Sequence, residues 1–302
     1  MISVCLACDD NYSKYAGVLI ASILVNADKS EELTFYILDG GISEEQKGKI
    51  RSLAYIKQCR INFVPIDNSM FDDYANIKTH RYISIATYYR LKLPTLLPEV
   101  KKIIYFDCDM VVNSSIAPLF NEDLKGCVLA GVKDINKRRL KKNPEYVNAG
   151  MLVMDIDAMK RENTEEKFLE YTKAHFSEIK AGDQDIINEV LKNKIKIVDD
   201  TWNVQSSNFT NRSSYTDKPK VIHYTAKRKP WHKYSFSYHK DYYFKYLKLT
   251  PWRLSEKEEK ELKSLKYKIV LLLKYFKYRP LFMLRPQFYK ALYYSYIKPF
   301  LK

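Results

Sequence analysis

Short apolar runs alternate with segments of helical period along the first part of the chain. Three runs rich in β-branched and aromatic side chains predict strands: residues 2–7, 33–38 and 61–66. After the first run, apolar positions at helical spacing predict one buried helix face: Ala16, Leu19, Ile20, Ile23 and Leu24. Ser43 with Gln46 forms a capping box that opens the next helix. Strands alternating with helices across short loops predict an α/β fold, a Rossmann-like, mostly parallel sheet flanked by helices.

The pattern continues through the middle of the chain. A helix predicted over residues 83–93 carries Arg90, and a strand over residues 128–132 ends close to Asp134. The strongly basic segment 137–142 is predicted to be a solvated, mobile loop over the site. Three small or polar residues at 148–150 predict a turn before the next strand, with side chains that let a ligand approach the backbone.

The last candidate elements lie between residues 182 and 232. Gly182 precedes a predicted helix in which Asp183 is a candidate N-cap. The stretch at 221–232 is predicted to be a short strand followed by a basic, aromatic loop. The composition shifts after Trp252, so the chain is predicted to comprise an α/β domain, residues 1–250, and a basic, aromatic helical tail, residues 251–302.

The clearest candidate chemistry follows an apolar strand at residues 103–106, which ends in Asp107 and Asp109. In extended backbone, residues i and i+2 point to the same side, so these two carboxylates converge at the end of a buried strand. Such oxygen ligands suit Mg²⁺ or Mn²⁺, and ligands bind at this edge of open α/β sheets. Two other Asp-x-Asp pairs occur at 155/157 and 183/185, and most acidic pairs are solvated turn residues or helix caps.

His223 is the natural third ligand for such a site, because carboxylate plus imidazole suits Mn²⁺. Lys227 and Lys229, which follow it, could neutralise a phosphate. The alternative is that His223 is a half-buried structural histidine. No glycine-rich dinucleotide fingerprint or P-loop is present in the sequence, so those modes of nucleotide binding are disfavoured.

The net charge of +15 is concentrated at the end of the chain. Residues 262–302 carry ten Lys/Arg, no Asp or Glu, and eleven Phe/Tyr, which is typical of a segment lying in a membrane interface. The alternative is a helical subdomain packed on the core with solvated lysines. The near-balanced remainder argues against a nucleic-acid-binding core. Five cysteines without a zinc-binding pattern, an acidic start and no apolar run of membrane-spanning length predict a protein with free thiols in a reducing cytoplasm.

Seven stretches in this order resemble glycosyltransferase family 8, the retaining GT-A-fold family, and most closely its bacterial branch of LgtC-like lipooligosaccharide α-galactosyltransferases. The matching stretches are residues 7–12, 38–43, 83–93, 105–109, 148–150, 183–185 and 223–231, and seven motifs in register are hard to obtain by chance. The resemblance spans about residues 1–240. One departure is Ala226, which stands where the family's H-Y-x-G-x-x-K-P-W loop has glycine.

The resemblance implies a Mn²⁺ site, with Mg²⁺ as an alternative, held by Asp107, Asp109 and His223. It implies that Gln184, Asp183 and Asp185 lie at the reacting carbon, and that a UDP-sugar contacts the following residues: Ala7, Asp9, Asn11, Tyr12, Arg90, Asp107, Cys108, Asp109, Asn148, Ala149, Gly150, Asp183, Gln184, His223, Ala226 and Lys229. Gln184 is a poor nucleophile, which favours same-face transfer, and double displacement through Asp185 remains the alternative.

The sequence is therefore interpreted as a retaining hexosyltransferase that uses UDP-galactose, or secondly UDP-glucose. It would extend a lipid-linked surface glycan such as lipooligosaccharide, as a peripheral protein on the inner face of the cell membrane. Tyr82 and the loops at 70–84, 135–145 and 205–215 are expected to contact the acceptor. The rival interpretations are a metal-dependent UDP-sugar hydrolase or nucleotidyltransferase, and a non-enzymatic membrane or nucleic-acid adaptor that acts through the tail.

Overall fold

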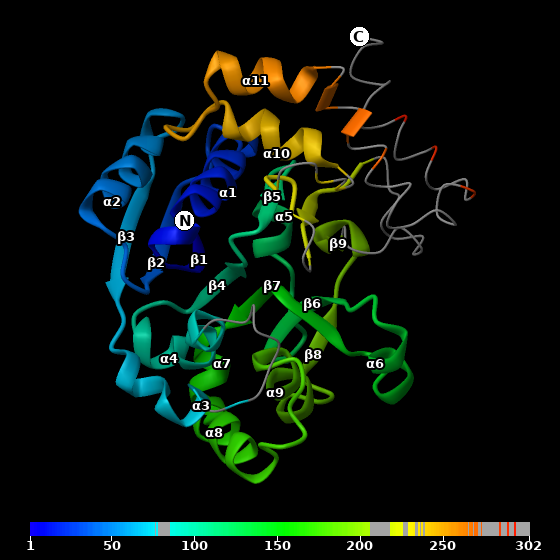
Figure 1. Ribbon diagram of the computed structural model, residues 1–302. Helices are drawn as coiled ribbons and strands as arrows, with labels where there is room; N and C mark the ends of the chain where they lie inside the picture. The colour runs from blue at the N-terminus through cyan, green and yellow to red at the C-terminus, as the bar shows by residue number, and fades with distance from the viewer. Residues whose placement is uncertain are drawn as a thin grey trace.

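A mainly parallel sheet forms the centre of the protein (Figure 1). The computed structural model describes the chain in these parts: residues 1–75, 77, 85–205, 218–225, 229–232, 235, 237, 239–264, 266, 267, 269, 270, 273, 284, 289 and 293. Within them, seven strands have the order β3-β2-β1-β4-β7-β6-β8. Their bounds are β1 (Ile2–Cys8), β2 (Leu33–Asp39), β3 (Arg60–Pro65), β4 (Lys102–Phe106), β6 (Leu129–Lys133), β7 (Val147–Asp155) and β8 (Ile195–Ile197).

Strands β3, β2, β1 and β4 run parallel, and β7 runs antiparallel to both of its neighbours, β4 and β6. Side chains alternate between the two faces, so Val4 and Leu6 enter one core while Cys5 enters the other. The first face packs against α1 (Ser13–Asn26) and α2 (Glu44–Arg51). The second face packs against α7 (Ile156–Arg161), α8 (Thr164–Ala174) and α9 (Asp183–Val190). The predicted α/β class with a mostly parallel, helix-flanked sheet is confirmed.

Helix α1 is more completely covered than its predicted apolar face requires. All five residues of that face are buried, and Val18 is buried as well. Val18 packs on the other side of the helix with Tyr243 and Leu247 of α10 (Lys240–Leu247). Trp252 lies against Gly17, where a Cβ atom would come within 2.2 Å of its ring. Tyr243, Leu247 and Trp252 therefore cover the side of α1 that the main sheet leaves open.

A second, smaller sheet positions the candidate site. Among the described residues it has the order β5-β10-β9, with β5 (Met110–Val112), β9 (Val204–Gln205) and β10 (Val221–His223). β10 pairs antiparallel with β5, so that His223 lies opposite Met110. On its other side His223 lies opposite Gln205, which directly follows η5 (Asp200–Asn203) and Val204. This sheet brings segments that are more than 80 residues apart to the carboxyl end of β4.

Four local predictions differ from the structure. The segment at 83–93 is a 3₁₀ helix, η4 (Ile85–Lys92), followed by α4 (Leu93–Leu96), because Pro94 disfavours a continuous α-helix before it. The basic segment 137–142 is a helix, α6 (Lys137–Lys142), with Asn136 as its N-cap. Residues 148–150 lie inside β7 rather than in a turn, because β4 and β6 pair with β7 on both sides. Gly182, with φ of 63°, is the N-cap of α9, so Asp183 is its first residue.

The remaining elements are short. They are η1 (Asp10–Tyr12), η2 (Ser52–Tyr55), η3 (Asn68–Phe71), α3 (Asp72–Ala75), α5 (Ala117–Phe120) and α11 (Glu256–Lys263). In the described part of the chain, none of the helices combines the length and the apolar character needed to cross a bilayer.

Candidate active site

Two carboxylates and one imidazole converge where β4 ends and β5 begins. His223 Nε2 lies 3.1 Å from Asp109 Oδ1 and 3.8 Å from Asp107 Oδ2. One ligand atom from each of the three residues lies within 4.8 Å of the other two. The strand end fixes the two carboxylates, and the pairing of β10 with β5 brings the imidazole to them. The predicted meeting of Asp107, Asp109 and His223 is what the structure shows.

The chemistry of this group fits a divalent cation. Asp109 Oδ1 is buried and accepts no hydrogen bond, although it faces the His223 ring nitrogen. Buried oxygens normally have partners, so an oxygen and a nitrogen that face each other in this way form a ready pair of ligands. Burial alone would raise the pKa of Asp109, but the charge of Lys229, with a smaller contribution from the His223 ring, outweighs it and holds that pKa well below its ordinary value. The carboxylate is therefore ionised, as a metal ligand must be.

Lys229 lies on the loop after β10 and forms an ion pair with Asp109 Oδ2. Its ammonium group also donates a hydrogen bond of 2.6 Å to the carbonyl of Tyr224. Trp231, two residues further on, stacks on Tyr15 of α1 with ring centroids 3.9 Å apart. This stacking holds Trp231 against the first helix, and Lys229, two residues before it, lies beside the carboxylate of Asp109.

Arg90 is the buried cation of the site. Its guanidinium pairs with Asp107 Oδ1 at 2.7 Å and with Asp183 Oδ2 at 3.0 Å, and it lies 4.1 Å from the centre of the Tyr105 ring. It also donates to the carbonyl of Ala149. Burial raises the pKa of Asp183 to about 7, with Arg90 opposing and Asp107 reinforcing the shift. One guanidinium thus joins β4, β7 and the start of α9.

Asn148 and Gly150, in the segment 148–150, contact different groups of the site. Asn148 Oδ1 accepts the backbone N–H of Gly150, and its amide nitrogen donates to Gln184 Oε1 at 3.0 Å. Gly150 provides room for His223, since a Cβ atom there would come within 2.3 Å of His223 Cε1. The sequence predicted that a ligand approaches this backbone, and the group that the structure places against Gly150 is the His223 imidazole.

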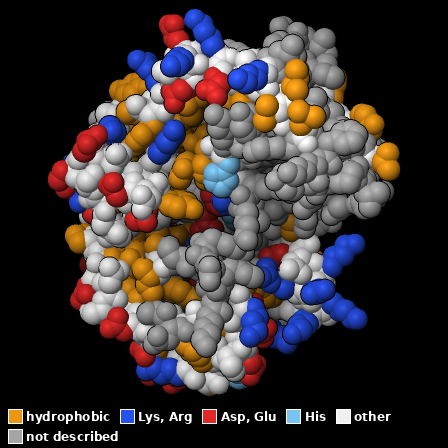
Figure 2. Space-filling model, in the orientation of Figure 1, with side chains coloured by type: hydrophobic (Ala, Val, Ile, Leu, Met, Phe, Trp, Pro, Cys, Tyr) orange, Lys and Arg blue, Asp and Glu red, His pale blue; other side chains and the backbone are white. Residues whose placement is uncertain are grey.

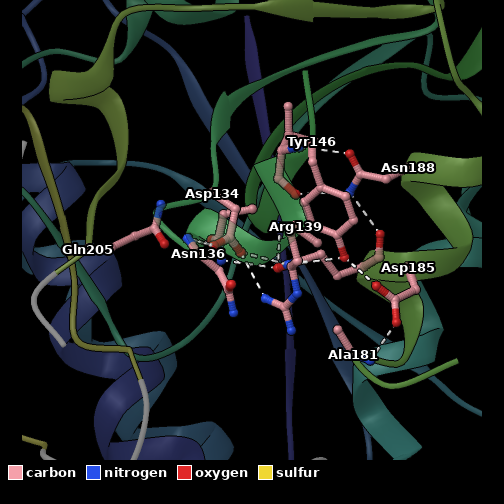
Figure 3. A network of polar contacts seen from close by, with 12 residues as sticks. Asp134, Asn136, Arg139, Tyr146, Ala181, Asp185, Asn188 and Gln205 are labelled. Carbon is pink, nitrogen blue, oxygen red and sulfur yellow. Dashed lines mark hydrogen bonds and ion pairs between the residues drawn. The ribbon is translucent and has the colours of Figure 1, made fainter. Parts of the chain in front are cut away.

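Gln184 lies beside Asn148 and belongs to a polar network, part of which is drawn in Figure 3. Gln184 Oε1 accepts from Asn148 and from the N–H of Ala149, and Gln184 Nε2 donates to Asp134 Oδ2 at 2.8 Å. Arg139 of α6 pairs with the same Asp134 oxygen at 3.0 Å. Both lone pairs of the Gln184 oxygen are therefore occupied in this state, which leaves it little capacity to act as a nucleophile.

Asp185 does not join Asp183 at the centre. Its carboxylate accepts hydrogen bonds from the Tyr146 hydroxyl and from the backbone N–H groups of Lys180 and Ala181 (Figure 3). Residues i and i+2 of an α-helix point to different sides. Asp183 therefore faces Arg90, while Asp185 binds the backbone of the loop before α9. At the third pair, Asp155 caps α7 by accepting from Ala158 N–H, as the alternative interpretation of such pairs expected.

The turn after β1 lies next to the group formed by Asp107, Asp109 and His223. Asp9 caps η1 by accepting the N–H of Tyr12 at 2.8 Å. The Cys108 thiol donates to the carbonyl of Ala7 at 3.0 Å, which joins the ends of β1 and β4. Burial, reinforced by the charge of Asp109, raises the pKa of Tyr12 to about 12. Asn11 is exposed on this turn.

Three of the predicted positions, Ala226, Lys227 and Tyr82, lie outside the described residues, as do most of the 205–215 loop and the greater part of the tail. Other residues of the site were not singled out by the sequence. Asn203 and Tyr146 contact site residues through their side chains, although neither lies in a recognisable motif. The sequence placed Asp134 at the end of a strand, like Asp107, but did not assign it to the site.

The whole site lies within the part of the chain that matches a known family. The glycosyl transferase family 8 profile matches residues 3–235. The chain belongs to glycosyltransferase family 8. Its predicted family resemblance is thus confirmed, and the hydrolase, nucleotidyltransferase and adaptor interpretations are not favoured.

Relatives in sequence and in structure agree with this assignment. A putative glycosyltransferase of Haemophilus influenzae is 33% identical over 77% of this chain and 73% of its own length. A lipopolysaccharide 1,2-glucosyltransferase of Escherichia coli K12 is 28% identical over 83% of this chain and 79% of its own length. The crystal structure of the galactosyltransferase LgtC with donor and acceptor sugar analogues is similar, with a TM-score of 0.74, 25% identity, and coverage of 86% of this chain and 100% of that one.

Proposed function

We propose that this enzyme transfers a hexose from a UDP-sugar to a glycan acceptor with retention of anomeric configuration, using Mn²⁺, or secondly Mg²⁺, held by Asp107, Asp109 and His223. The observation that carries the proposal is the convergence of these three ligands beside two cations, Arg90 and Lys229. Galactose is the first choice of sugar and glucose the second. LgtC is a galactosyltransferase and the Escherichia coli relatives are glucosyltransferases, so the two groups of relatives support different sugars.

Arg90 and Lys229 lie beside the carboxylate and imidazole group, and their positive charge would suit a departing nucleoside diphosphate. Asp107, Asp109 and His223 would hold a divalent cation, which would supply Lewis-acid stabilisation of the negative charge on a departing diphosphate. When the diphosphate binds, Lys229 can exchange its ion pair with Asp109 for one with a phosphate oxygen, since it is a flexible point charge. Arg90 is held by two carboxylates and stays in place, so we propose that it orients Asp183 beside the donor sugar.

The uridine part of the donor is proposed to lie over the turn at residues 7–12, with Ala7, Asp9, Asn11 and Tyr12 as contacts and Cys108 beneath. The sugar is proposed to lie over Asn148, Ala149 and Gly150, next to Asp183 and Gln184. Ala226 completes this donor set as a proposal from the sequence. Retention by same-face attack is supported by two features of α9: the Gln184 oxygen is already occupied, and the Asp185 carboxylate is bound elsewhere.

The acceptor is proposed to be a lipid-linked surface glycan such as lipooligosaccharide, bound near Tyr82 and the segments 70–84, 135–145 and 205–215. Lys and Arg side chains gather over α6 (Figure 2), where Lys137, Arg138, Lys141 and Lys142 are exposed. Such a surface favours an acceptor that carries negative charge. Double replacement of Lys141 and Lys142 by Glu should raise the KM for a phosphorylated acceptor and not that for its dephosphorylated form. Equal effects on the two would remove α6 from the acceptor site.

The second part of the chain, residues 251–302, is proposed to hold the enzyme at the inner face of the cell membrane. Within the described part of residues 262–302, the exposed side chains include Ile269, Leu273, Leu284 and Tyr289. Together with the ten basic residues of this tail, exposed apolar groups suit an anionic interface.

A donor panel tests the proposed activity. Purified protein is incubated with UDP-galactose, UDP-glucose and other UDP-sugars, with Mn²⁺ or with EDTA, and UDP release and thermal shift are measured. We expect metal-dependent release from one of the first two donors, stimulated by acceptor and lost in Asp109→Ala. Release that is independent of acceptor would indicate a hydrolase, and release that survives Asp109→Ala would remove the metal site from the reaction.

A further inference from the structure

The proposed metal ligand His223 is connected to the donor-sugar residues by an unbroken series of buried hydrogen bonds. His223 Nδ1 lies 3.2 Å from Asn203 Oδ1, and Asn203 Nδ2 donates to Asn148 Oδ1 at 3.0 Å. Asn148 Nδ2 donates to Gln184 Oε1, and Gln184 Nε2 donates to Asp134. Asn203 is 2% exposed, so its contacts are shielded from bulk solvent.

Which atom of each side-chain amide donates and which accepts is determined by backbone groups that can only donate. The backbone N–H of Gly150 points at Asn148 Oδ1, and the N–H of Ala149 points at Gln184 Oε1. A backbone N–H can only donate, so those two amide atoms must be the oxygens. The Asp134 carboxylate accepts at the far end and confirms that the other end of the Gln184 amide is the nitrogen.

With Asn148 oriented, Asn203 has one remaining orientation. It must present its nitrogen to Asn148 Oδ1, and therefore its oxygen to His223 Nδ1. An amide oxygen accepts, so Nδ1 of the neutral ring carries the proton. Nε2 then has its lone pair toward Asp109 Oδ1 and Asp107, which is the arrangement that a metal ligand requires.

We propose that Asn203 is a positioning residue that sets the tautomer of His223 and couples the metal site to the amide groups beneath the donor sugar. The proposal rests on the proposed function only in assigning a metal to the three ligands. The fixed tautomer follows from the hydrogen-bond series alone. If Asn203 is removed, the ring is free to move its proton to Nε2 and donate to Asp109 Oδ1, which blocks the ligand position.

Two substitutions of Asn203 separate its contact with His223 from its contact with Asn148. Asn203→Ala removes both contacts and is expected to weaken Mn²⁺ binding by about 10- to 100-fold. Asn203→Asp keeps an oxygen that accepts from Nδ1 but loses the donor to Asn148. It should therefore retain most of the Mn²⁺ affinity, yet lower kcat at saturating Mn²⁺. Asn26→Ala is the matched control, because it also removes an internal amide, which donates to the carbonyls of Ser22 and Val112 and to the Tyr246 hydroxyl and to none of the three ligands.

Free Mn²⁺ is measured by electron paramagnetic resonance during titration of each protein. In parallel, the His223 tautomer is measured by ¹⁵N NMR on the metal-free protein at a pH where the ring is neutral, with His223→Gln to assign the signal. We expect the Nδ1–H form in the wild type, in Asn203→Asp and in Asn26→Ala, and an increased Nε2–H form in Asn203→Ala. An Nε2–H ring in the wild type, or unchanged Mn²⁺ affinity in Asn203→Ala, would overturn the proposal. If the wild type does not bind Mn²⁺ at all, the proposed function is wrong. The NMR measurement of the tautomer still tests whether Asn203 positions the His223 ring.

Discussion

The imidazole of His223 lies against the α-carbon of Gly150, so close that any side chain on residue 150 would overlap it. The two residues come from different sheets, β7 and β10, and Gly150 also accepts the backbone N–H of Asp107 at 2.8 Å. Gly150 therefore touches two members of the candidate metal site at once. The requirement for glycine here is one of space, since no unusual φ value is involved.

This contact predicts the effect of Gly150→Ala. The added methyl group would meet His223 Cε1 at 2.3 Å and Met110 at 2.8 Å, so the ring must move away from Asp109. We expect Mn²⁺ affinity to fall at least 10-fold, as measured by direct metal titration, while the fold persists. Gly48→Ala is the matched control, because a Cβ at Gly48 of α2 meets nothing within 4 Å, and Ala is the better helix former. Unchanged metal binding in Gly150→Ala would show that the ring position is not essential.

Arg90 is predicted to be a major contributor to stability. Replacing it by Met leaves the buried carboxylate of Asp183 without a counter-charge, which should lower the free energy of unfolding by about 3 kcal/mol at pH 8. Adding Asp183→Asn to Arg90→Met should restore part of the loss, because the unpaired charge is then absent. Arg51→Met is the surface control, since Arg51 is exposed and pairs with Glu44 at 3.5 Å. Urea unfolding of the four proteins measures these differences, and equal losses for Arg90 and Arg51 would contradict the prediction.

The raised pKa of Asp183 predicts a pH dependence in the metal-free protein. The carboxyl titrates near its ordinary value of about 4 in the unfolded chain and near 7 in the folded protein, where burial disfavours its charge. Between these values the folded protein binds more protons, so this group lowers the free energy of unfolding as the pH rises and has no further effect above about pH 8.

The comparison that isolates this group is wild type against Asp183→Asn. The difference in unfolding free energy, wild type minus variant, should fall by roughly 4 kcal/mol between pH 4 and pH 8, from about 1.4 kcal/mol per unit of pKa difference. Chemical unfolding at several pH values in EDTA provides the measurement. A difference that rises with pH would show that Arg90 outweighs burial and holds the carboxylate ionised.

Asp185 is predicted to be dispensable for the chemical step. Its carboxylate accepts from Tyr146 and from two backbone N–H groups, so it supports the start of α9 rather than facing the donor. Asp185→Asn, which keeps one acceptor oxygen, should retain most of the kcat while lowering the melting temperature. Two results together would instead support double displacement. They are loss of turnover in Asp185→Asn and a covalent glycosyl-enzyme in the mass spectrum of a second variant, Asp185→Glu.

The tail is predicted to be required for membrane attachment and not for catalysis. Removal of residues 262–302 deletes ten basic and eleven aromatic residues. We expect loss of sedimentation with anionic vesicles, together with unchanged turnover on a soluble acceptor. Vesicle binding that persists after the deletion would reject the proposed membrane role of this segment.

The sequence by itself determined the local part of this protein. Short apolar runs placed the strands around residues 2–7, 33–38 and 61–66, and a period of 3.6 placed the buried face of α1. The position of Asp107 and Asp109 after an apolar run marked the edge of the sheet where the site lies. These features depend on neighbours within a few residues, which a single sequence displays directly.

Tertiary structure decided the remainder. Residues 148–150 became the interior of a strand because two strands pair with β7, a choice that local composition does not contain. Asn203 acquired its place between His223 and Asn148 only through the small sheet that carries β9 and β10. Its neighbours lie 20 and 55 residues away in the chain, and no periodicity relates residues at such separations. The direction of an amide series, and with it the tautomer of a metal ligand, exists only once all of its members are packed together.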